Sequence, residues 1–289
     1  MSEISPDPGL FGPGSVTWRV QSDPIMWVAG LRALLLQATH PAAMAGVLEH
    51  SDFRADPWGR LRRTADYVGT IAFGSTEEVA RAGARVRGIH GKVRGLDGRT
   101  GRTYRASDPE LLLWVHCCEV ESFVTTYRRA GGQLTTDEVD RYYTEQTHSA
   151  EVVGIDPSVA PASATAMASY FRQMRPQLEV DARTRRMAGY VLLPPMPTRV
   201  RLTTPARPVW FAVASLSAAL LPRWARRLYG LPGLPTTDLA ATAGLRGLRA
   251  ALQLAPQRYR EGPHVRAANA RMAQPSVGDS SAASPAQGA

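Results

Sequence analysis

Helix-start signals recur along this chain and constrain its fold more than any other feature. Asp23-Pro24, Asp56-Pro57 and Asp108-Pro109 each join a residue that caps helix N-termini to a proline, which suits the first helical position. Ser75-Thr76-Glu77-Glu78 places a cap before two carboxylates, whose charge suits the N-terminal end of the helix dipole. Because alternating apolar and polar strand patterns are scarce, the sequence predicts an all-α fold.

Helical spacing of apolar residues divides the chain into helices of ordinary length. Pro194 to Pro197 reads as a rigid connector, and the turn-rich segment 96–103 predicts a small hairpin or loop. The first half of helix 110–129 is apolar all round, which places it at the centre of the core. The predicted helices cover 25–39, 42–48, 58–69, 75–95, 110–129, 136–149, 163–177, 180–191, 208–229, 238–252 and 256–261.

The domain organisation follows from composition. The chain has 289 residues, of which 44% are hydrophobic, enough for one large all-α domain, which we place at 17–262. Residues 1–16 hold three prolines and three glycines and predict an irregular N-terminal arm. Residues 263–289 have almost no large apolar side chains, so we expect a disordered tail there.

The charge distribution argues against a nucleic-acid partner. The formal net charge is +9, and Lys92 is the only lysine among 34 basic residues. The arginines are scattered along the chain and alternate with apolar residues, as on solvated helix faces, rather than clustering with aromatic residues. An acidic partner or a membrane surface stays possible, although membrane association is not the favoured interpretation.

Cysteine usage and the N-terminus indicate a cytoplasmic protein. Cys117 and Cys118 are adjacent in an apolar segment, so no disulfide framework exists, which is typical of a reducing compartment. Residues 1–8 lack the positive and apolar regions of a secretory signal. The longest apolar stretch, 210–221, is too short to span a bilayer and favours a buried core helix.

His90 is the most informative candidate site residue, because it is predicted to point inward from its helix. It lies at the edge of an apolar stripe formed by Val79, Ala82, Val86, Ile89 and Val93. A buried imidazole needs a partner for at least one ring nitrogen. An inward histidine in a helical protein is therefore either a hydrogen-bonded core residue or an axial ligand to a metal or haem.

Other polar residues occur at helical spacing. Arg60, Arg63, Thr64 and Tyr67 share one face of helix 58–69, which reads either as a solvated basic face or as the polar wall of a ligand pocket. His40 and His116 also lie on apolar helices, and each taken alone reads as a packed core histidine.

Several kinds of site are excluded by spacing. The chain has no zinc-type histidine or cysteine spacing, no Cys-x-x-Cys-His haem attachment, no serine nucleophile elbow, no phosphate loop and no dinucleotide turn. A non-covalent b-type haem suits the chain better than zinc, because haem supplies four equatorial nitrogens and needs only one axial side chain.

The order of these motifs resembles the DUF2236 family, over roughly residues 20–230. That family includes the latex-clearing rubber oxygenases and the MpaB-type oxygenase that cleaves a prenyl side chain. The resemblance is carried by Gln37-x-x-His40-Pro41, Arg60-Leu61-x-x-Thr64-x-x-Tyr67, Ile89-His90-x-x-Val93-x-Gly95, Tyr104-x-Ala106-x-Asp108-Pro109 and Trp114-Val115-His116.

The resemblance implies a globin-like helical core with non-covalent haem b and with His90 as the proximal iron ligand. It matches Arg60 and Thr64 to the haem-pocket arginine and threonine of the rubber oxygenases. Arg63 stands where those enzymes carry a lysine that closes the distal iron site, and a guanidinium that stays protonated is a poor iron ligand. Glu49 lies near the region of their catalytic glutamate without matching it.

The function implied is a haem b-dependent oxygenase that acts on a hydrophobic small molecule, alkene-like or isoprenoid-like. O₂ is expected opposite His90, near Arg60 and Thr64 as catalytic residues. His40, Arg63, Tyr67 and His116 are expected to line the cofactor site. The alternatives are a haem-binding sensor or carrier without oxygenase turnover, and a structural helical domain whose histidines are merely packed.

Overall fold

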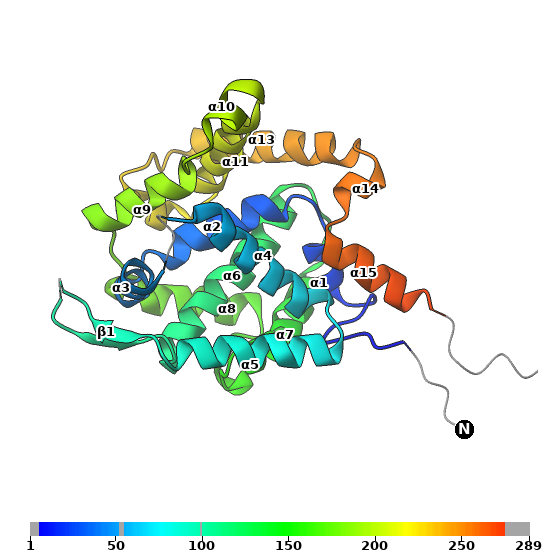
Figure 1. Ribbon diagram of the computed structural model, residues 1–289, viewed down its shortest axis with the longest axis horizontal. Helices are drawn as coiled ribbons and strands as arrows, with labels where there is room; N and C mark the ends of the chain where they lie inside the picture. The colour runs from blue at the N-terminus through cyan, green and yellow to red at the C-terminus, as the bar shows by residue number, and fades with distance from the viewer. Residues whose placement is uncertain (1–5, 52–54, 99, 275–289) are drawn as a thin grey trace, which may run out of the picture.

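A computed structural model describes residues 6–51, 55–98 and 100–274. The described chain consists of helices and one two-stranded sheet, which confirms the all-α prediction (Figure 1). The helices are α1 (Val16–Gln21), α2 (Met26–Gln37), α3 (Pro41–His50), α4 (Pro57–Phe73), α5 (Thr76–His90), α6 (Pro109–Arg129), α7 (Thr136–Val152), α8 (Ala164–Met174), α9 (Ala182–Leu192), α10 (Thr198–Thr203), α11 (Ala206–Ala219), α12 (Arg223–Tyr229), α13 (Pro235–Gln253), α14 (Gln257–Arg260) and α15 (Pro263–Met272), with 3-10 turns at Pro157–Val159 and Arg175–Gln177.

The predicted helix starts are formed by the expected caps in two of the three Asp-Pro cases. The side chains of Asp56 and Asp108 accept backbone hydrogen bonds from the first turns of α4 and α6. Asp23 caps differently, because α2 begins only after Ile25. Its carboxylate accepts from the Ile25 backbone N–H at 3.1 Å and binds the Nε of Arg249 at 2.8 Å.

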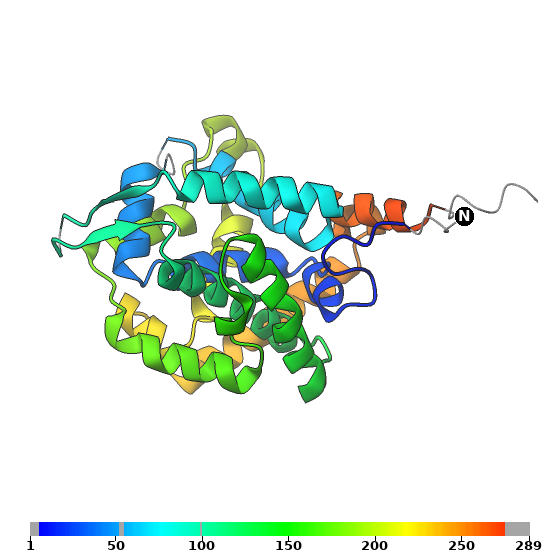
Figure 2. The same ribbon diagram turned by 90° about the horizontal axis from the view of Figure 1, so that it is seen from below.

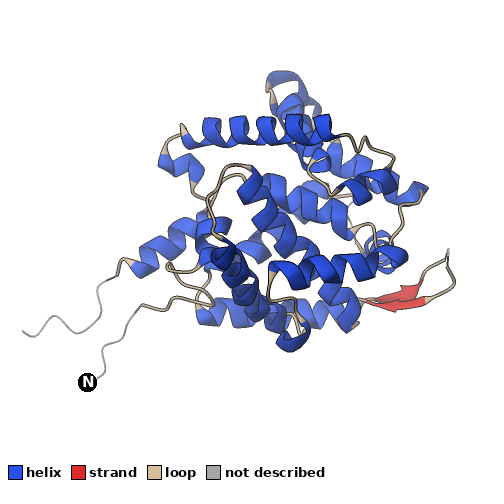
Figure 3. Ribbon diagram, turned by 180° about the vertical axis from the view of Figure 1, so that it is seen from behind, coloured by secondary structure: helices blue, strands red, loops and turns tan. Residues whose placement is uncertain are grey.

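The small hairpin or loop predicted at 96–103 belongs to a β-hairpin, in which Leu96 pairs with Thr103. Strand β1 (Arg94–Leu96) pairs antiparallel with β2 (Thr103–Arg105), with Gly95 opposite Tyr104. Figure 3 shows this hairpin, in red, projecting from the helical body. Helix α5 therefore ends at His90 rather than near Gly95, because the chain enters β1 at Arg94.

The prediction of one helix over 208–229 is wrong. The chain forms α11 and α12 there, separated by Leu220 to Pro222. Pro222 has no backbone N–H and its ring crowds the preceding turn, so a helix does not continue through it. Leu220 and Leu221 in the break are fully buried, which explains why the apolar pattern runs on across it.

The prediction of a disordered tail from residue 263 is wrong for residues 263–272, which form α15. Val265, Ala268 and Met272 recur at helical spacing and pack on Trp18 and Phe73, with Ala268 fully buried. Arg271 donates to the backbone carbonyls of Phe73 at 2.7 Å and of residue 7 at 2.8 Å. Figure 2 shows α15 and the N-terminal segment at the same end of the molecule. Residues 275–289 lie outside the described residues.

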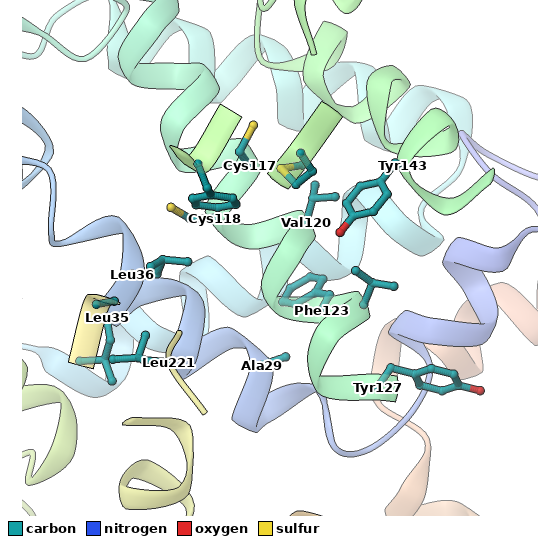
Figure 4. Packing of buried hydrophobic residues seen from close by; sticks show 14 of the residues in the cluster. Ala29, Leu35, Leu36, Cys117, Cys118, Val120, Phe123, Tyr127, Tyr143 and Leu221 are labelled. Carbon is teal, nitrogen blue, oxygen red and sulfur yellow. The ribbon is translucent and has the colours of Figure 1, made fainter. Parts of the chain in front are cut away.

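The main core forms around α2 and α6, which make the most extensive contact between any two elements of the described chain. Figure 4 shows Leu36 of α2 on the side toward α6 and Leu35 beside Leu221. Cys117 and Cys118 are fully buried and both thiols are free, as their apolar surroundings predict. Burial raises the pKa of both thiols.

Two buried arginines link neighbouring helices through ion pairs and hydrogen bonds. The Arg32 guanidinium on α2 is almost fully buried, lies 2.6 Å from the Glu121 carboxylate on α6 and donates to the Leu220 carbonyl at 3.0 Å. Arg226 on α12 is equally buried and pairs with Asp238 on α13. A charge buried this deeply is tolerated because it is paired and hydrogen-bonded.

Candidate functional site

Two polar side chains of α6, His116 and Glu119, are half-buried inside the fold. Both are deeply surrounded by protein, yet each keeps accessible surface. Desolvation there lowers the pKa of His116 to about 4 and raises the pKa of Glu119 to about 7. At neutral pH the imidazole is uncharged and the carboxyl is poised between its two protonation states.

Tyr67 of α4 faces the same region. The residue is half-buried, and its hydroxyl is buried without a hydrogen-bond partner among the described residues. Burial raises the pKa of Tyr67, and the charge of Glu119 adds to this shift while Arg87 opposes it. The electrostatic coupling between Tyr67 and Glu119 connects the polar face of α4 with the enclosed groups of α6.

Arg60 lies on the same face of α4, nearly two turns before Tyr67. Its guanidinium is half-buried and donates to the hydroxyl of Ser51 at 2.6 Å. Burial lowers the pKa of Arg60, and the neighbouring positive charge of Arg63 adds to this shift. A guanidinium keeps its charge even so, which leaves Arg60 able to bind an anionic group.

Arg63 and Thr64 are more exposed than Arg60. Arg63 pairs with Asp56 at 3.2 Å on the surface, at the start of α4. Thr64 is exposed, and its hydroxyl donates to the backbone carbonyl of Arg60 at 3.0 Å. Thr64 shares a helix face with Arg60 and Tyr67. This face of α4 is therefore exposed to solvent around Thr64.

His90 is the last residue of α5 and lies on its buried face. That face runs through Val79, Gly83 and His90, and a Cβ at Gly83 would lie 2.6 Å from the side chain of Val152 on α7. Val79 is buried as predicted, whereas Ile89 is 51% exposed, so its assignment to the inward stripe is wrong. The close packing at Gly83 turns the helix so that His90, rather than Ile89, points inward.

The imidazole of His90 carries an unsatisfied polar atom. Its Nδ1 is buried without a hydrogen-bond partner among the described residues, and desolvation lowers the pKa of the ring. Arg60 precedes Ser75 by 15 residues, and His90 follows it by 15 residues. The two residues therefore lie at similar distances along α4 and α5 from the turn that joins these helices. Figure 1 shows α4 and α5 meeting near the turn that joins them and separating away from it.

His40 lies at the other side of the site, as the N-cap of α3. Its ring centroid is 6.1 Å from that of Trp114, and its Nδ1 is buried without a partner among the described residues. Burial lowers the pKa of His40, and Asp108 partly opposes this. Gln37 donates to the Val115 carbonyl at 3.2 Å, which holds α2 against α6 just before His116.

The sequence did not point to Glu119, and it did not place Glu49. The spacing His116-x-x-Glu119 in an apolar helix was the available signal, since unpaired carboxylates are almost never enclosed without a reason. Glu49 is engaged elsewhere, because it accepts a hydrogen bond from the Tyr104 hydroxyl at 2.5 Å. This bond joins α3 to the β-hairpin.

Three further observations concern the described part of the chain as a whole. A hollow of about 230 Å³ lies on the surface between α4, α5 and α15, and none of the predicted site residues lines it. Within the described ranges, no group of three or more His, Cys, Asp or Glu side chains could hold a bare metal ion. Of the helices that the structure describes, none combines the length and apolar character needed to cross a bilayer.

Comparison with known protein families identifies the chain. Residues 18–254 match the catalytic domain described as "ER-bound oxygenase mpaB/B'/Rubber oxygenase". The chain belongs to this oxygenase family. The match spans α2 to α13 and so includes every predicted site residue. The predicted membership is thereby confirmed.

Curated relatives of this oxygenase-family chain include the uncharacterized protein Mb2261 of Mycobacterium bovis and the uncharacterized protein Rv2237 of Mycobacterium tuberculosis. Each is 25% identical over 156 residues, which cover 53% of this chain and 61% of the relative. The match therefore spans less than two thirds of the relatives' own length. No solved structure matches the chain.

Proposed function

We propose that this protein is a haem b-dependent oxygenase acting on a hydrophobic small molecule, with His90 as the axial ligand of the iron. The observation that carries the proposal is an inward-facing histidine with an unpartnered ring nitrogen, in a family of oxygenases. The substrate class we propose is alkene-like or isoprenoid-like.

The residues present fit a haem. His90, His40 and Tyr67 each have a buried polar atom without a partner among the described residues, so each could hydrogen-bond or ligate a bound group. His116 and Glu119 add two half-buried, desolvated polar groups on α6. A haem requires a single axial side chain, so it does not depend on a cluster of metal ligands. When bound, haem b would supply the iron at which O₂ is activated.

His90 is the residue best suited to hold the iron. The lowered pKa keeps its imidazole neutral at pH 7, and a neutral imidazole is the form that ligates a metal. Arg60 carries the half-buried positive charge of the site and is suited to bind a haem propionate or to donate to an oxygen atom. Its hydrogen bond to Ser51 holds the guanidinium in place.

We assign proton handling at the proposed site to Glu119 and Tyr67. A carboxyl with a pKa of about 7 can give up or accept a proton at physiological pH, which an ordinary glutamate cannot do. The Tyr67 hydroxyl stays protonated and can donate a hydrogen bond. His116 stays neutral at the same pH, so it adds no charge to the space that an apolar substrate would occupy.

The test compares two arginines of the same helix. Protein loaded with haem is supplied with a series of hydrophobic alkenes, and O₂ consumption is measured for the wild type, Arg60→Gln and Arg62→Gln. Arg62 is exposed and serves as the matched control. Arg60→Gln should lower the rate about tenfold, as expected for a group that positions a cofactor or its ligand, while Arg62→Gln keeps the wild-type rate. Haem binding without O₂ consumption on any alkene would instead support a sensor or carrier.

A further inference from the structure

The segment from α9 to the start of α13 has an unusual charge distribution. Between Asp181 and Asp238 the chain contains nine arginines and no aspartate or glutamate. Elsewhere along the chain arginines and carboxylates are interspersed. Arg183, Arg223 and Arg226 pair with carboxylates at or beyond the ends of the segment, and the other six arginines form no ion pair with the described residues. A long segment with only positive charges is attracted to polyanionic partners or surfaces.

Exposed apolar side chains gather in the same segment. Leu202 of α10 is 74% exposed, and Val209 and Phe211 of α11 are 57% and 49% exposed. Arg199, Arg201 and Arg207 are exposed between them, and their guanidinium groups form no ion pair or hydrogen bond with the described residues. We call these residues, together with Val200, the α10–α11 face.

The α10–α11 face projects from the molecule. Figures 1 and 3 show α10 at the outer edge, with α11 and α13 beneath it. Every residue of α10 is exposed, so no element of the described chain covers it. Exposed apolar side chains that gather in one region mark an interaction surface.

We propose that the α10–α11 face docks the protein onto an anionic membrane surface. The arginines would contact lipid phosphates, while Leu202 and Phe211 would enter the boundary between headgroups and acyl chains. Charge complementarity selects this partner over a second copy of the chain, because two faces that carry only positive charges repel each other.

The face is connected to α4. Trp210 of α11 packs edge-on against Trp58 at 4.7 Å between ring centroids, and the Trp58 indole donates to the Pro195 carbonyl at 2.9 Å. Arg60 follows Trp58 on the same helix. If the proposed function is correct, a membrane-dissolved apolar substrate would arrive beside α4. The docking itself does not depend on that function.

The experiment measures binding of the full-length protein to vesicles by flotation. We expect binding to vesicles that contain phosphatidylglycerol with phosphatidylcholine, none to phosphatidylcholine alone, and weaker binding as the salt concentration rises. Arg199→Gln combined with Arg201→Gln should reduce binding about thirtyfold, since each arginine at an anionic surface contributes about 1 kcal/mol. Leu202→Ser with Phe211→Ser should reduce it at least about tenfold.

Two control variants change equivalent side chains elsewhere. Arg62→Gln with Arg85→Gln removes two exposed arginines from α4 and α5, and Leu254→Ser removes a leucine that is 88% exposed. Both should bind vesicles like the wild type. Equal loss of binding in the controls, or binding that ignores lipid charge, would overturn the proposal. So would a wild-type dimer in sedimentation that becomes monomeric in Leu202→Ser with Phe211→Ser.

Discussion

Replacing Glu119 with glutamine should change how the stability of the protein depends on pH. The carboxyl lies in the enclosed region of α6, where burial raises its pKa from 4.5 to about 7. Glutamine has nearly the same shape but cannot ionise. The variant therefore isolates the charge of residue 119 from its packing.

The sign follows from the direction of the shift. Below about pH 4.5 the carboxyl is protonated in both the folded and the unfolded chain and adds no pH dependence. Between about pH 4.5 and pH 7 the unfolded chain has lost this proton while the folded chain keeps it, so the free energy of unfolding falls as pH rises. A shift of this size corresponds to about 3 kcal/mol, lost in full above about pH 7.

The assay is urea unfolding without added haem, followed by circular dichroism from about pH 4 to pH 8. The useful quantity is the difference in the free energy of unfolding between Glu119→Gln and the wild type, because other titrating groups such as His40, His90 and His116 contribute to both. As the pH rises from about 4 to about 8, the free energy of unfolding of the variant should increase by about 3 kcal/mol relative to that of the wild type. Glu110→Gln removes an exposed carboxyl from the same helix and should retain the wild-type fall. A difference that stays constant with pH would refute the placement of Glu119 in an enclosed space.

Three further outcomes follow from the packing. Glu121→Ala leaves the Arg32 guanidinium buried without its partner and should lower the free energy of unfolding by about 3–5 kcal/mol, measured by urea titration; a loss below about 1 kcal/mol would contradict a buried pair. Ser75→Ala removes one half of the capping box of α5 and should cost about 1 kcal/mol in the same titration, whereas no change would mean that the cap is frayed in solution. Cys117 and Cys118 should resist alkylation by iodoacetamide until the protein is unfolded, because burial raises the pKa of both thiols; rapid labelling of the folded protein, read by mass spectrometry, would show that this part of α6 is open.

Much of the fold could be predicted because helix starts are local. Asp56, Ser75 and Asp108 cap helices with atoms only two or three residues away, so short sequence patterns contain the necessary information. The order of the motifs around His40, Arg60, His90 and His116 was sufficient for the family. The globin-like core stays a prediction.

The remainder depends on contacts between distant parts of the chain. Helix α15 is stabilised by Trp18 and Phe73, which no local composition rule takes into account. Ile89 is exposed because Gly83 packs closely on α7 and sets the rotation of α5. Glu119 directly follows an apolar segment, so the sequence suggests only that this segment ends there. The burial of the carboxyl depends on how α6 packs among its neighbours.

The central proposal is that His90 ligates a haem iron, and absorption spectroscopy tests it most directly. Purified protein is titrated with haem, and the Soret band is recorded for the wild type, His90→Ala and His148→Ala, whose exposed imidazole on α7 makes it the control. The wild type and His148→Ala should saturate at one haem per chain with a histidine-ligated spectrum, while His90→Ala should lose that spectrum and bind haem at least about tenfold more weakly. A His90→Ala protein with the wild-type spectrum and affinity would contradict the proposal.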